Sequence, residues 1–198
     1  MKKIKTDARL YYNARDLADI LNRFGLDCQS EALVMERIWH NERPLLEERY
    51  RTDKRRLILE TYYWKSYAHH KADIDAEFPA IREDSRAYGG SMERANLLND
   101  CSDIDMFFKL ARMQILYGGG NPYVRIKRST LLSGYKHKRL SPLLLDRIQG
   151  CLEFYRLETY LRGGVPCKIK DVKSDTVLTL RVAQPPKKTP LPAKKWAK

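Results

Sequence analysis

The chain has 198 residues, of which 43% are hydrophobic and 32% charged, a composition typical of a soluble globular protein. No stretch approaches the roughly 18 consecutive apolar residues that a membrane helix needs, and Met1 to Lys5 is not followed by an apolar signal core, so we expect a cytoplasmic protein. The formal net charge of +13 favours a polyanionic partner, most often nucleic acid. The alternative is a charged surface that only maintains solubility.

The cysteines are widely separated and form no C-x-x-C pair, which argues against a zinc site and against a disulfide scaffold. We expect reduced structural thiols and no bound cofactor. The four positions are Cys28, Cys101, Cys151 and Cys167.

Two helices are predicted near the N-terminus. Asn13 can cap the first, with Asp16 completing a capping box and Gly25 closing the helix. Ser30 is the predicted cap of the second helix, which should end before Pro44. Both helices carry apolar residues at helical spacing, so we expect each to bury one face.

A third, long helix is predicted from Pro44 to about Ala68, although the segment 57–64 is β-favouring by composition. Potential metal ligands follow it: His69, His70, Asp73 and Asp75. Adjacent histidines on a helix point about 100° apart, so a solvated helix is favoured over a metal site.

One enzyme-like pattern is present. Gly90-Ser91, followed by Asp103 and Asp105, resembles the nucleotidyltransferase signature, in which Gly-Ser holds a triphosphate and two carboxylates bind magnesium. However, Ser102 and Asp105 also fit a capping box, and apolar residues then recur at helical spacing. These residues are Ile104, Phe107, Phe108, Ala111 and Ile115. The helix accounts for more of the segment, so we favour a protein that is not an enzyme.

The C-terminal half predicts a short helix, a basic turn, a longer helix and then β-rich segments, the order of a winged helix-turn-helix. Ser141 can cap the longer helix, which should reach Leu157, and Pro142 suits its first position. The predicted strands are Tyr123 to Lys127, Thr159 to Leu161, Val165 to Val172 and Thr176 to Val182.

A resemblance supports this interpretation. The run Gly134-Tyr135-Lys136-His137-Lys138-Arg139, followed by Ser141 and the helix, resembles a small domain at the C-terminus of some bacterial restriction and phage-defence proteins. It covers about 60 residues, and His137 departs from the all-basic form of that motif. The resemblance implies a DNA-directed or defence role, in a phage-defence or mobile-element system.

We therefore expect a mainly α-helical protein with a small β component, divided into four parts. Residues 1–117 form a helical region for self-association or partner docking, and residues 118–122 a Gly-rich hinge. Residues 123–183 form the winged-helix-like nucleic-acid-binding unit. Residues 184–198, rich in Pro and Lys, have too little apolar surface to fold alone and should be an extended basic tail.

The expected function is non-enzymatic binding of nucleic acid, with double-stranded DNA favoured over RNA. The alternatives are an interaction subunit of a larger nucleoprotein or antiviral assembly and a metal-dependent nucleotidyltransferase using Ser91, Asp103 and Asp105. Protein partners or a homodimer would use the N-terminal helices. The candidate nucleic-acid-binding residues are Arg125, Lys127, Arg128, Lys136, Lys138, Arg139, Arg147, Gln149, Arg156, Lys187 and Lys188.

Overall fold

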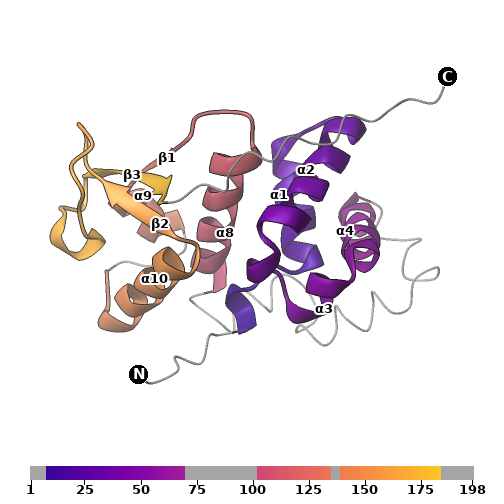
Figure 1. Cartoon of the computed structure of the whole chain (residues 1–198). Coiled ribbons are helices and arrows are strands. Elements are labelled where there is room, and N and C mark those ends of the chain that lie inside the picture. Colours follow the sequence, from indigo (N-terminus) through magenta and orange to yellow (C-terminus); the bar gives the residue numbers. More distant parts are fainter. Residues whose placement is uncertain (1–7, 70–101, 135–138, 184–198) are drawn as a thin grey trace.

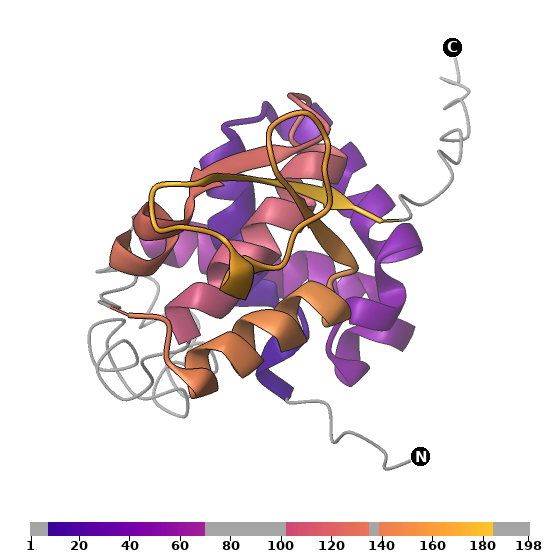
Figure 2. The same cartoon turned by 90° about the vertical axis from the view of Figure 1, so that its left-hand side faces the viewer.

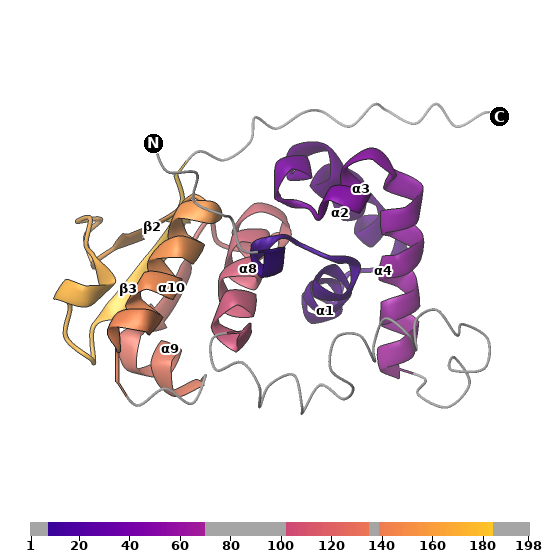
Figure 3. The same ribbon diagram turned by 90° about the horizontal axis from the view of Figure 1, so that it is seen from below.

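The computed structural model describes residues 8–69, 102–134 and 139–183. Its described part is mainly helical with a small antiparallel sheet, which confirms the predicted fold class (Figure 1). The N-terminal helices lie on one side, and the sheet lies on the other, with helix α8 (Ser102–Tyr117) between them in both Figure 1 and Figure 3. The predicted tail at 184–198 and the cluster at His69 to Asp75 fall outside the residues whose side chains are described.

The N-terminal helices begin and end at side-chain and glycine signals. Helix α1 (Ala14–Phe24) has the predicted capping box between Asn13 and Asp16, and Gly25 closes it with φ of 60°. Helix α2 (Cys28–Asn41) begins two residues before Ser30, the predicted cap. Asp27 caps it instead, because its carboxylate accepts hydrogen bonds from the amides of both Gln29 and Ser30.

Replacing Asn13 with Ala is expected to destabilise the protein by about 1 kcal/mol, because the amide of Asp16 loses its acceptor at 2.8 Å. Urea unfolding followed by circular dichroism measures the change. Asn22→Ala in the same helix is the control, since Asn22 lies away from the helix N-terminus. Equal losses for the two variants would contradict the cap assignment.

The predicted long helix from Pro44 is wrong. The chain instead forms a 3₁₀ turn (Arg43–Leu45), a short helix α3 (Glu48–Thr52) and helix α4 (Lys54–His69). The interruption at Leu46 has a physical cause: the backbone there is extended and pairs with Tyr12. The Tyr12 amide donates to the Leu45 carbonyl at 2.9 Å, and the Glu47 amide donates to the Tyr12 carbonyl at 3.0 Å.

The sheet contains strands β1 (Val124–Lys127), β2 (Leu157–Tyr160) and β3 (Val177–Val182), in the order β1-β3-β2, all antiparallel. Helices α9 (Arg128–Gly134) and α10 (Pro142–Phe154) follow β1, and Ser141 caps α10 as predicted. The strand predicted at 165–172 is wrong. That segment makes an isolated bridge at Pro166 and a 3₁₀ turn (Ile169–Asp171), and Pro166 has no N–H to donate to a strand partner.

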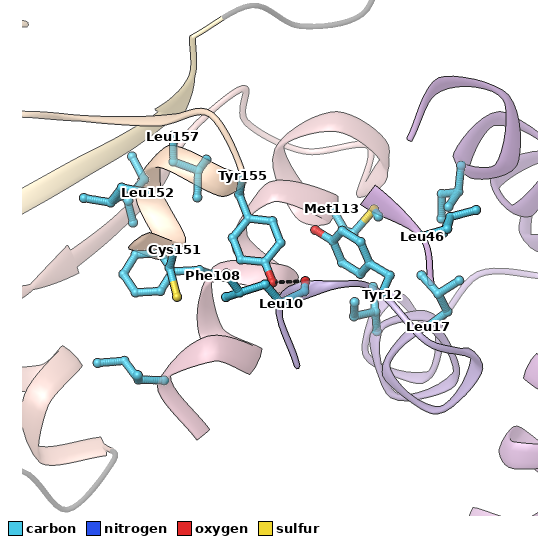
Figure 4. Packing of buried hydrophobic residues seen from close by; sticks show 14 of the residues in the cluster. Leu10, Tyr12, Leu17, Leu46, Phe108, Met113, Cys151, Leu152, Tyr155 and Leu157 are labelled. Carbon is cyan, nitrogen blue, oxygen red and sulfur yellow. Dashed lines mark hydrogen bonds between the residues drawn. The ribbon is translucent and has the colours of Figure 1, made fainter. Parts of the chain in front are cut away.

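The core is continuous across the predicted hinge at 118–122. One hydrophobic cluster contains α1 residues such as Leu17, α8 residues such as Phe108, and residues of α10 and the sheet. Figure 4 shows Tyr12 and Tyr155 within this cluster, with ring centroids 5.6 Å apart. The Tyr155 hydroxyl donates to the Leu10 carbonyl at 2.5 Å. The two predicted units therefore share a core through α8, and their separation at 118–122 stays a prediction.

Buried ion pairs join α8 to the N-terminal region. The Lys109 ammonium lies 2.5 Å from an Asp16 carboxylate oxygen, and the Arg112 guanidinium lies 2.8 Å from a Glu42 carboxylate oxygen. Arg112 also donates to the backbone carbonyl of Tyr155 at 2.6 Å. A single arginine thus holds the N-terminal region and the end of α10 together.

Candidate nucleic-acid interface

Positive charge is distributed unevenly along the chain. Residues 102–183 contain 15 Lys and Arg and 7 Asp and Glu, a formal excess of +8. Residues 8–69 contain 11 Lys and Arg and 10 Asp and Glu, an excess of +1. Between these two parts, the positive excess thus belongs to the one that contains α8, α9, α10 and the sheet.

Two predicted residues lie on the sheet face that points away from α8. Arg125 and Lys127 alternate along β1 with Val124 and Ile126, and both cations are exposed as expected. The burial of Leu178 and Leu180 on β3 shows that the opposite face of the sheet packs on the core. Figure 2 shows the sheet from the side away from the N-terminal helices.

Sequence reasoning missed three residues on the same face: Tyr123, Tyr160 and Arg181. Register places them beside the predicted cations, since Arg125 pairs with Thr179, and Thr179 pairs with Tyr160 on the other side. Arg181 alternates along β3 with the buried Leu178 and Leu180, so the sequence pattern alone indicates that it is exposed. Only the strand order shows that β1 and β2 lie on either side of β3. The Tyr160 hydroxyl donates to the Glu158 carboxylate, and this hydrogen bond raises the pKa of Tyr160.

Arg147, one of the candidate nucleic-acid-binding residues, is largely buried. Its Nε donates to Asp105 of α8 at 2.6 Å, and a second guanidinium nitrogen contacts the other carboxylate oxygen. The Cys151 thiol also donates to Asp105 at 3.3 Å. Burial, with Asp105 close by, raises the pKa of this thiol well above its usual range, so Cys151 stays protonated. Arg147 and Asp105 thus hold α10 against α8.

The remaining exposed face of α10 carries no free cation. Asp146, Gln149 and Glu153 are exposed there, and the Gln149 amide donates to the Glu153 carboxylate at 2.9 Å. Arg156 is exposed just after the helix, with φ of 50°. It lines a depression of about 410 Å³ together with Glu153, Glu158, Cys167 and Lys168. Its charges are of both signs, so this depression does not select an anion.

Two other predicted residues have different surroundings. Arg128, at the start of α9, is half-buried and donates to the backbone carbonyl of Val172, so it helps fix the segment before β3. Arg139 is exposed before α10. The candidates Lys136, Lys138, Lys187 and Lys188 lie outside the described residues.

The enzyme-like pattern is only partly described, since Ser91 and the Asp103 side chain fall outside what the structure describes. Asp105, its remaining member, lies in helix α8 and is paired with Arg147. Within the described ranges, no cluster of three or more His, Cys, Asp or Glu could hold a metal ion. None of the helices searched there is long and apolar enough to cross a membrane.

Comparison with protein-family models, with curated proteins and with solved structures finds no match to this chain.

Proposed function

We propose that this protein is a non-enzymatic nucleic-acid-binding protein whose binding surface belongs to residues 102–183. The observation that carries the proposal is the formal excess of +8 in this part, against +1 in residues 8–69. Nucleic-acid affinity comes largely from cations that neutralise phosphates and release counterions, so the larger excess favours residues 102–183 over residues 8–69 as the folded contact region. The segment 184–198 adds five lysines of its own.

The order of elements supports the same proposal. The element order α8-β1-α9-α10-β2-β3, with sheet order β1-β3-β2, is consistent with a winged helix in which α8 would be the first helix. The unit would then begin at residue 102 rather than at 123, with α9 and α10 as the helix-turn-helix pair. A fold of this kind hosts several functions, so it supports nucleic-acid binding only together with the charge.

We also propose the cytoplasm as the compartment. Among the described residues, Cys28, Cys151 and Cys167 are free thiols, and a reducing compartment maintains that state.

Fluorescence anisotropy of the full-length protein with labelled 30-nucleotide single strands and duplexes, from 50 to 200 mM KCl, tests the proposal. Affinity is expected to fall steeply with salt, since each neutralised phosphate adds about 0.7 to 0.9 to the slope of log K against log salt. The matched control replaces Lys187, Lys188, Lys194, Lys195 and Lys198 with Gln. Clear binding by this variant at 50 mM KCl is expected, and its complete loss would contradict a site within residues 102–183.

A further inference from the structure

The exposed face of the sheet brings cations and aromatic rings together in adjacent rows. One row crosses all three strands at Arg125, Thr179 and Tyr160. In the next row, Arg181 pairs with Glu158, and extension of the β1–β3 register places Tyr123 on its other side. Lys127 pairs with the exposed Val177 in a third row. Three cations, two tyrosines and the Glu158 carboxylate thus share one solvent-facing surface with a formal excess of +2, which we call the sheet platform.

The tyrosines and arginines of the sheet platform already interact. The Arg125 guanidinium lies 4.7 Å from the centroid of the Tyr123 ring, and the Arg181 guanidinium lies 5.4 Å from that of Tyr160. Each guanidinium lies over one face of its ring, so a base would stack on the other face while the neighbouring cation contacts the phosphate of the same nucleotide. Proteins bind single strands through a positively charged groove flanked by aromatic side chains, because every base has a face that can stack on a ring.

Helix α10 offers the opposite electrostatics. Its exposed positions include Asp146 and Glu153, while its one arginine, Arg147, is held by Asp105. A helix entering the major groove passes close to two phosphate backbones, which repel carboxylates. The acidic surface of α10 therefore makes it a poorer nucleic-acid contact than the sheet platform.

We infer that the sheet platform binds a single-stranded segment of nucleic acid, with Arg125, Lys127 and Arg181 contacting phosphates and Tyr123 and Tyr160 stacking on bases. This inference rests on the proposed function and specifies the ligand class. It places the principal contact on the sheet rather than on the helix that follows the basic turn. The proposed ligand is an unpaired strand, whereas the sequence analysis favoured double-stranded DNA.

Anisotropy titrations of the full-length protein with labelled 12-nucleotide dT and rU strands and with a 12-base-pair duplex test the inference. The double variant Tyr123→Leu, Tyr160→Leu keeps every charge and removes both rings. Its affinity for both single strands is expected to fall at least about tenfold, with duplex affinity changed less than about twofold. Tyr160→Phe keeps the ring and is expected to bind like the wild type. The wild-type affinities for dT and rU show which of the two strands is preferred.

Two further variants separate charge from position. Arg125→Gln, Lys127→Gln and Arg181→Gln together should lower the single-strand salt slope by about 2. Gln149→Ala, on α10, keeps every charge and should leave single-strand affinity unchanged. Thermal unfolding monitors whether each variant is folded. If the double tyrosine variant does not fold, the single variant Tyr160→Leu is compared with Tyr160→Phe. A loss of single-strand affinity in Tyr160→Phe as large as in Tyr160→Leu would overturn ring stacking.

The possible failures are distinct. If the wild type binds nucleic acid but prefers the duplex, or if the tyrosine variants retain full single-strand affinity, the sheet platform is not a single-strand site, although nucleic-acid binding stands. If the wild type binds none of the three probes at 50 mM KCl, both this inference and the proposed function are wrong.

Discussion

Replacing Arg112 with Met is expected to destabilise the protein by about 3–5 kcal/mol, the largest single effect that we predict. The reason is the Glu42 carboxylate, which is only 1% exposed and would lose its cation, while the Arg112 side chain itself is 5% exposed. The backbone carbonyl of Tyr155 would lose a donor at the same time. Urea unfolding at pH 7, followed by tryptophan fluorescence and circular dichroism, measures the loss.

The double variant Arg112→Met, Glu42→Leu provides the matched control. Removing both charges leaves no unpaired ion in the core, so this variant should regain much of the lost stability, and Tyr117 loses only one hydrogen-bond acceptor. Arg23→Ala breaks an exposed pair with Asp19 and should cost less than about 1 kcal/mol. A loss below about 1 kcal/mol for Arg112→Met would show that this pair does not join the two parts of the chain.

Replacing Arg147 with Leu is expected to destabilise the protein by about 3 kcal/mol, near the lower end of the range for a broken buried pair. The Asp105 side chain is 4% exposed, so its carboxylate would be left in the core with the Cys151 thiol as its remaining hydrogen-bond donor. The Arg147 side chain is 14% exposed, which lets water compensate in part. Denaturant unfolding again provides the measurement.

Asp105→Asn distinguishes this structural role from the nucleotidyltransferase interpretation. If Asp105 serves to hold Arg147 and Cys151, the Asn variant should lose roughly as much stability as Arg147→Leu. An Asp105→Asn protein with unchanged stability, but without a magnesium-dependent nucleotide product that the wild type forms, would contradict the structural role and favour the enzyme.

Local signals in the sequence were sufficient to predict the helices whose first residue is determined by a few neighbouring side chains. Asn13 with Asp16, and Ser141 with Pro142, begin α1 and α10 where the caps predict. The alternation that exposes Arg125 and Lys127 on β1 could likewise be predicted, because a strand with one buried face requires it.

Elements that depend on distant partners could not be predicted in this way. The break at Leu46 arises from backbone pairing with Tyr12, 34 positions earlier, which no local propensity encodes. Val165 to Val172 has strand composition, yet it forms a single bridge and a 3₁₀ turn in which Ile169 is buried. Long-range contacts outweighed β propensity there.

The candidate site shows the same division. Arg147 looked available from helical spacing alone, but its partner Asp105 lies 42 positions away on α8. Tyr123, Tyr160 and Arg181 become neighbours only through the order β1-β3-β2, which the sequence does not specify. Several expectations stay predictions. They are the roles of Lys136, Lys138 and the tail lysines, the resemblance to defence proteins and the alternative of an interaction subunit.

Hydrogen–deuterium exchange of the full-length protein, with and without saturating oligonucleotide, tests the central claim most directly, because it locates the contact without any substitution. We predict that protection on binding is concentrated within residues 123–127 and 157–183, with little change in helices α1, α2 and α4. Protection confined to residues 8–69, with the sheet segments unchanged, would contradict nucleic-acid binding by the C-terminal part of the chain.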